Sequence, residues 1–79
     1  MDRFYFDVED GKSERDEEGT ELSGLAEVRH ASVKLLGEEL CERDRSFWDD
    51  PELKITVRDD NDLILLRLTV FGTTAPAGR

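Results

Sequence analysis

The stretch LKITVRDDNDLILLRLTVF, from Leu53 to Phe71, decides the fold because it is the most apolar part of a highly charged chain. Leu53, Ile55 and Val57 alternate with polar residues, which is the period-two pattern of a strand that buries one face. The polar residues 59–62 then form a compact loop before a second apolar run returns the chain. We therefore expect a β-hairpin.

The returning strand is apolar on both faces at its start, which is typical of a strand in the middle of a sheet. Strict alternation divides its apolar residues between two faces. One face is expected to hold Ile64, Leu66, Leu68 and Val70, and the other Leu63, Leu65 and Phe71.

The length of 79 residues indicates one domain, which we place at residues 1–72, followed by a flexible C-terminal tail at 73–79. A domain of this size buries a limited core and gains stability from pairing. The net charge of -9 repels nucleic acid and anionic membranes, so neither is an expected partner. A single cysteine, Cys41, fits a reducing compartment. With no signal peptide and no long apolar run, the sequence favours the cytoplasm.

The N-terminal half supplies a further strand and a helix. Phe4, Phe6 and Val8 alternate with polar residues, which predicts a first strand that ends at the turn signal Asp10-Gly11. The polar segment that follows leaves room for a short second strand around residues 13–16. We expect Gly19 to supply a positive φ in the next turn.

A helix is predicted from an N-cap at Ser23 to about Arg43 or Arg45. Its residues Glu39 and Arg43 are spaced to form an i, i+4 ion pair. The apolar stripe at helical spacing consists of Leu25, Val28, Ser32, Leu35, Leu36 and Leu40, flanked by Ala31 and Val33. After the helix, Phe47 and Trp48 are expected to close the end of the core.

These elements predict an α+β domain with the order ββαββ, in which one helix packs on one face of a three- to four-stranded, mainly antiparallel sheet. A single helix leaves the other face of the sheet open, and an exposed face that mixes apolar and basic groups is typical of an interface. The candidate interface residues are Tyr5, Lys54, Arg58, Leu63, Leu65, Arg67 and Phe71.

Three segments carry a resemblance to a known family: RFYFDVEDG at the start, RDEEGTEL before the helix, and ITVRDDND followed by an apolar strand. The chain resembles a small, uncharacterised bacterial domain family, catalogued as a domain of unknown function. The sequence departs from that pattern in the segment SFWDDPE and in the loop 59–62, which lacks glycine. The resemblance implies a compact α+β domain in a bacterial cytoplasm, without assigned catalytic residues.

The sequence does not predict an enzyme, a cofactor or a metal site. His30 and Cys41 are separated by eleven residues of helix, about 16 Å at 1.5 Å per residue, too far apart for a catalytic dyad. The loop that starts at Asp59 fails the EF-hand pattern, because Ile64 and Val70 occupy the positions of the required glycine and glutamate. No P-loop or dinucleotide fingerprint accompanies the acidic clusters.

Two functions from different classes remain open. The first is a non-catalytic interaction module that associates with itself, as a homodimer, or with another protein, through the uncovered sheet face or the last strand. The alternative is a small regulatory domain that senses a ligand. Its acidic loops would suit a divalent cation, and Arg58 with Arg67 would suit a nucleotide-like anion.

Overall fold

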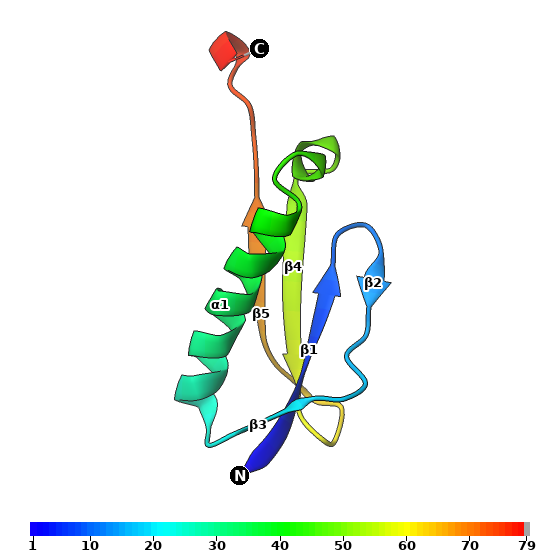
Figure 1. Ribbon diagram of the computed structural model, residues 1–79, viewed down its shortest axis with the longest axis vertical. Helices are drawn as coiled ribbons and strands as arrows, with labels where there is room; N and C mark the ends of the chain where they lie inside the picture. Colours follow the sequence, from blue (N-terminus) through cyan, green and yellow to red (C-terminus); the bar gives the residue numbers. More distant parts are fainter. Residues whose placement is uncertain (79) are drawn as a thin grey trace.

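The computed structural model describes residues 1–78 and shows one antiparallel sheet with a single long helix (Figure 1). The elements are β1 (Asp2–Glu9), β2 (Ser13–Glu14), β3 (Thr20–Leu22), α1 (Leu25–Glu42), the 3-10 turn η1 (Ser46–Asp49), β4 (Glu52–Arg58), β5 (Ile64–Phe71) and η2 (Pro76–Gly78). The strand order is β2-β1-β4-β5, and β3 pairs with the start of β1. The predicted α+β class is confirmed.

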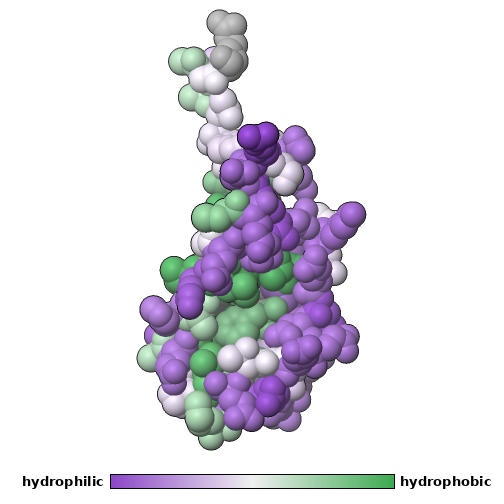
Figure 2. All heavy atoms as spheres, viewed as in Figure 1, coloured by the Kyte–Doolittle hydropathy of each residue, from purple (hydrophilic) through white to green (hydrophobic). Residues whose placement is uncertain are grey.

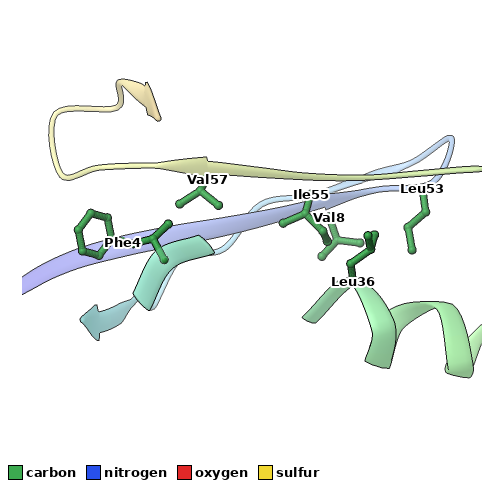
Figure 3. Close-up of a cluster of buried hydrophobic side chains, with 7 residues drawn as sticks. Phe4, Val8, Leu36, Leu53, Ile55 and Val57 are labelled. Atoms are coloured by element: carbon green, nitrogen blue, oxygen red, sulfur yellow. The ribbon is translucent and has the colours of Figure 1, made fainter. Parts of the chain in front are cut away.

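The hydrophobic core lies between α1 and the face of β1 and β4 that looks toward it (Figure 3). Leu53, Ile55 and Val57 of β4 are fully buried, as the period-two pattern indicates. The other buried apolar residues are Phe4 and Val8 of β1 and Val28 and Leu36 of α1. Each such side chain contributes roughly 1.5–3 kcal/mol relative to an exposed position, so this layer dominates the stability of the domain.

The helix presents the predicted stripe to the sheet, but its ends differ from expectation. Val28, Ser32 and Leu36 are buried, whereas Leu25 is exposed. Gly24, not Ser23, occupies the N-cap position, and no side chain caps the helix there. The Ser23 backbone N–H and hydroxyl instead donate to the Glu27 carboxylate. The helix ends at Glu42, and the predicted ion pair between Glu39 and Arg43 forms at 2.9 Å.

The polar segment before the helix forms two short strands rather than one. The predicted strand around residues 13–16 is limited to Ser13–Glu14, and β3 was not expected. Both run antiparallel to β1, with Glu14 opposite Val8 and Thr20 opposite Phe4. These pairings raise the strand number to five. Gly19 has a φ of 74°, which confirms the positive φ expected from the sequence.

The hairpin contains a bulge that changes the predicted division of faces. Leu66 lies opposite Val57, but Ile64 lies opposite Arg58, so Leu65 is an extra residue in β5. Because paired residues share a face, Ile64 lies with Arg58 on the face away from α1. Strict alternation predicts that Ile64 shares a face with Leu66, and this prediction is wrong. In a run where every residue is apolar, the hydrophobic pattern is the same before and after a register shift. The sequence pattern therefore misplaces Ile64.

The hairpin loop extends one residue beyond the predicted four. Leu63 belongs to the loop, and its carbonyl accepts the Asp59 N–H at 2.9 Å. The Asp62 N–H donates to the Asp59 carbonyl at 3.0 Å, which closes the turn. With no glycine available, Asp62 adopts the left-handed conformation, with a φ of 67°. Aspartate tolerates this region better than most other residues, so the loop closes without glycine.

The end of the core is closed by one of the two predicted aromatics. Phe47 packs against the core, whereas Trp48 is 55% exposed and contacts Phe47 edge to face. A Cβ atom at Gly72 would lie 2.9 Å from the Phe47 ring, so glycine permits this close approach. Beyond Gly72 the chain extends away from the sheet (Figure 1), and Arg79 of the predicted tail lies outside the described residues.

Among residues 1–78, no helix combines the length and the hydrophobicity that crossing a membrane requires.

Candidate functional site

The sheet face opposite α1, here called the outer face, is organised around Arg58. Its guanidinium is buried and stacks over the Tyr5 ring, 4.7 Å from the ring centroid. Asp7 binds it with both carboxylate oxygens, at 2.9 and 3.3 Å. The Asp16 carbonyl accepts from it at 2.7 Å and the Asp62 carboxylate at 3.2 Å. We call these five residues the Arg58 cluster.

Asp16 joins the Arg58 cluster to the edge of β1. One carboxylate oxygen accepts the backbone N–H of Phe6 at 3.1 Å, in the gap between the parts of β1 that pair with β2 and β3. The other oxygen accepts the N–H groups of Glu18 and Gly19, both at 3.1 Å. The carboxylate thus replaces a strand carbonyl at this edge and fixes the turn that leads to β3.

Hydrogen bonds lower the pKa of two aspartates in this half of the molecule. Burial raises the pKa of Asp16, but the backbone N–H groups of Gly19, Phe6 and Glu18 outweigh it and hold the pKa below its ordinary value of 3.8. The hydrogen bond from Arg43 holds the pKa of Asp10 below the same value, against a smaller effect of burial. The folded state therefore stabilises the charged form of both carboxylates relative to the unfolded chain.

We expect the free energy of unfolding to decrease as the pH falls below about 3.8. The unfolded chain binds protons at its ordinary aspartate pKa, whereas folded Asp10 and Asp16 bind them only at lower pH. Their contribution is complete above the unfolded pKa and is lost as the pH falls through the folded pKa. Urea denaturation at a series of pH values measures this, and Asp16→Asn should flatten the profile. An unchanged slope in that variant would contradict the assignment.

The candidate interface residues occupy three different environments. Tyr5 and Arg58 are joined in the Arg58 cluster, and half-buried Lys54 lies 3.8 Å from the Glu52 carboxylate of the same strand. Both of these basic groups of β4 are therefore paired with acidic neighbours. Leu63 lies in the loop and Leu65 in the bulge, so neither shares a regular strand face with the others.

Arg67 and Phe71 remain exposed on β5, the last strand of the sheet. The Arg67 side chain donates to the Thr56 hydroxyl at 3.3 Å, and Phe71 is 69% exposed. Ile64, which the sequence assigned to the core face, adds an exposed apolar group, with 57% of its surface accessible. The apolar surface of the outer face thus lies along β5, from Ile64 beside Arg58 to Phe71 at the other end of the strand.

The other residues considered for chemistry stay apart in the structure. His30 and Cys41 are both exposed on α1. In the loop after β4, the Asp59 carboxylate accepts the N–H groups of Asn61 and Leu63, and Asp62 binds Arg15 and Arg58. Within residues 1–78, no group of three or more histidine, cysteine, aspartate or glutamate residues is placed to hold a metal ion.

The three segments that carry the family resemblance supply the Arg58 cluster between them. RFYFDVEDG contains Tyr5 and Asp7, RDEEGTEL contains Asp16, and ITVRDDND contains Arg58 and Asp62. A family model described as Domain of unknown function (DUF6894) matches residues 3–72. The chain belongs to this family. No curated protein and no solved structure matches it.

This DUF6894 domain closes one edge of its sheet and leaves the other free. β2 and the Asp16 carboxylate occupy the edge of β1 that faces away from β4. β5, at the opposite end of the strand order, pairs only with β4 within the described residues. A free edge strand presents a row of unpaired backbone N–H and C=O groups to a partner.

The backbone groups on the free edge of the DUF6894 domain can be identified from the register. Gly72 donates its N–H to the Pro51 carbonyl at 2.9 Å, next to the pair formed by Glu52 and Phe71. Hydrogen-bonded and non-hydrogen-bonded pairs alternate along an antiparallel ladder. The N–H and C=O groups of Arg67, Thr69 and Phe71 therefore point away from β4.

Sequence reasoning missed the three aspartates of the Arg58 cluster, Asp7, Asp16 and Asp62. Asp7 lies 51 residues before Arg58, and the strand order that brings them together is a tertiary property. The segment RDEEGTEL did contain a signal, since an aspartate three residues before a glycine of positive φ is typical of a side-chain-stabilised turn.

Proposed function

We propose that this chain is a non-catalytic association module that pairs with a second copy of itself through the free edge of β5. The observation that carries the proposal is the asymmetry of the sheet, in which one edge is closed by β2 and Asp16 and the other, eight residues long, has no partner within residues 1–78. Edge strands that are long and apolar readily pair with another chain.

The composition of β5 supports pairing between two copies. The strand ILLRLTVF contains no acidic residue, although the whole chain carries a net charge of -9. Arg67 is its one charged residue, and together with the bulge at Leu65 it gives the strand limited protection against edge pairing. Two copies that meet along β5 therefore bring no acidic residue of this strand close to another.

The register of the pairing follows from the two faces of β5. A two-fold axis at Leu68 places Leu66 opposite Val70 of the second copy, and Arg67 opposite Thr69, so that residues of the same face meet. An axis at Arg67 would place two guanidinium groups directly opposite each other, which is destabilising. An axis at Thr69 would shorten the paired segment. The axis at Leu68 gives the longest ladder without a like-charge pair.

Charge substitutions at Thr69 test this register. We expect Thr69→Glu to tighten the dimer and Thr69→Lys to weaken it, because position 69 faces Arg67 of the second copy twice in the symmetric pair. Each cross-strand charge pair contributes roughly 0.2–1 kcal/mol, so the dissociation constants of the two variants should differ by about tenfold. Sedimentation velocity at low ionic strength measures both constants.

Thr74→Glu and Thr74→Lys are the matched controls, because they change the net charge equally at a residue beyond the end of β5. Equal weakening by Thr69→Glu and Thr69→Lys would place the two-fold axis elsewhere and contradict the register. A monomeric unmodified protein at all accessible concentrations would contradict the proposed function itself.

The contacts of the described residues do not favour the alternative of a ligand-sensing domain. An anion site at Arg58 would compete with Asp7, Asp16 and Asp62, which already bind its guanidinium. A cation at the loop after β4 would compete with the backbone and arginine groups that bind Asp59 and Asp62.

A further inference from the structure

The helix covers only part of the sheet face on which it lies. α1 packs mainly against β4, with fewer contacts to β5, and leaves the β1 side of this face less covered. A hollow of about 360 Å³ lies there, with a floor formed by Phe6 and Val8 of β1 and by Ala31 and Leu35 of α1. We call it the β1–α1 hollow. Figure 2 shows apolar atoms gathered between hydrophilic walls in this part of the surface.

The walls of the β1–α1 hollow are acidic on both sides. Glu14 and Asp16 line it from the segment after β1, and Glu39 lines it from α1. Glu38 and Glu42 follow Ala31 and Leu35 by seven residues, which places them on the same side of the helix. Two of these five charges are already engaged, since Glu39 binds Arg43 and the Asp16 carboxylate accepts three backbone N–H groups.

The remaining three carboxylates have no ion pair within residues 1–78. Glu14, Glu38 and Glu42 are exposed, and none of them lies within ion-pair distance of a basic side chain in the described part of the chain. Glu14 of the lining, with Glu38 and Glu42 on the same side of the helix, leaves negative charge, unpaired among the described residues, around the apolar floor. Such a surface attracts a partner that is both apolar and positively charged.

We propose that the β1–α1 hollow binds a basic amphipathic peptide, which places large apolar side chains on the floor and lysine or arginine side chains against the walls. The hollow runs along α1 from Ala31 to Glu39, a rise of about 12 Å at 1.5 Å per residue, enough for about two turns of a helix lying in the groove. Its volume lies near the lower limit of roughly 300–1,000 Å³ for ligand pockets.

Charge selects this occupant over the others. Nucleic acid and other polyanions are repelled by the walls, and so is a second copy of this chain, with its net charge of -9. The hollow opens on the β1 side of the helix face, whereas the free edge belongs to β5. A dimer paired through β5 therefore keeps both hollows available.

Fluorescence anisotropy with a labelled probe tests the proposal. The probe is a twelve-residue peptide that repeats Lys-Lys-Leu-Leu, compared with one counterpart that has serine in place of leucine and another that has glutamate in place of lysine. We expect the basic amphipathic probe to bind in the micromolar range, with an affinity that falls as salt is raised, and both counterparts to bind at least tenfold more weakly. Equal binding of the serine counterpart would overturn the proposal, because charge alone would then explain the binding.

Three variants locate the binding. Ala31→Trp fills the floor of the hollow and should reduce the affinity at least tenfold, whereas Val33→Trp, on an exposed part of α1, should leave it unchanged. Glu14→Lys leaves the core unchanged and should also weaken binding. It therefore tests the proposal even if Ala31→Trp disturbs folding. Amide NMR shifts on addition of the probe should centre on Phe6, Val8 and Leu35. Undiminished binding by Ala31→Trp and Glu14→Lys, shifts centred elsewhere, or no binding at 1 mM probe would overturn the proposal.

Discussion

Asp7→Asn should lower the free energy of unfolding by about 3 kcal/mol, as measured by urea denaturation at pH 7. Asp7 holds the buried guanidinium of Arg58 with both carboxylate oxygens and also accepts the backbone N–H of Asp16 at 2.9 Å. Removing one partner of a buried ion pair typically costs roughly 3–5 kcal/mol, because the other charge stays buried without full compensation. Asp62 still binds Arg58, which keeps the expected loss at the lower end of that range.

Glu21→Gln is the matched control, because Glu21 forms an exposed ion pair with Arg3 at 3.0 Å. Exposed pairs contribute at most about 1 kcal/mol. A double variant, Asp7→Val with Arg58→Met, should recover much of the stability lost in Asp7→Asn, because it removes both charges from the buried position. If Asp7→Asn cost no more than Glu21→Gln, the Arg58 cluster would not be a main source of stability.

Asp16→Ala should lower the free energy of unfolding by about 2–3 kcal/mol, the second largest effect expected among these substitutions. It removes the acceptor of three backbone N–H groups, of which that of Phe6 lies at a partly buried position of β1. A buried donor left without an acceptor costs roughly 1–3 kcal/mol, and the two turn donors can recover hydrogen bonds with water. Thermal or urea unfolding gives the total loss.

Amide exchange separates this local effect from a general loss of stability. In Asp16→Ala the Phe6 amide should exchange faster relative to Val57, whose position in the core is unchanged. Asp16→Asn retains one side-chain oxygen as an acceptor and should lose less stability than Asp16→Ala. Parallel acceleration of the Phe6 and Val57 amides would show that Asp16 has no special role at this edge.

The sequence predicts the parts of the fold that depend on local periodicity. Alternation placed Leu53, Ile55 and Val57 in the core, and helical spacing placed Val28 and Leu36 there. These signals are readable because one face of each element is buried, and burial alone imposes the period.

Features that depend on contacts between distant segments could not be read in the same way. β3 has only three residues, and pairing with Asp2–Phe4, rather than a hydrophobic pattern of its own, makes it a strand. The bulge at Leu65 shifts the register within an apolar run, where both registers look alike. The helix begins at Leu25 after Gly24, although Ser23 is the better capping residue by type.

The exposure of the candidate interface residues was predictable in part. Alternation correctly placed Arg67 and Phe71 on an exposed face of the last strand. It could not reveal that Asp7 and Asp16 would enclose Arg58, because neither the strand order nor the path of the polar segment is encoded locally. The basic patch expected on the outer face is therefore mostly neutralised, and the exposed apolar residues of that face, Ile64 and Phe71, lie on β5.

Amide hydrogen exchange as a function of protein concentration tests the proposed pairing through β5 most directly. The N–H groups of Arg67, Thr69 and Phe71 point away from β4, so they are open to solvent in a monomer and hydrogen-bonded in the proposed dimer. We expect their exchange to be fast at low micromolar concentration and to slow at least tenfold at high concentration, while the amides of Leu66 and Leu68 change much less. Fast exchange of Arg67, Thr69 and Phe71 at every concentration would contradict association through this edge.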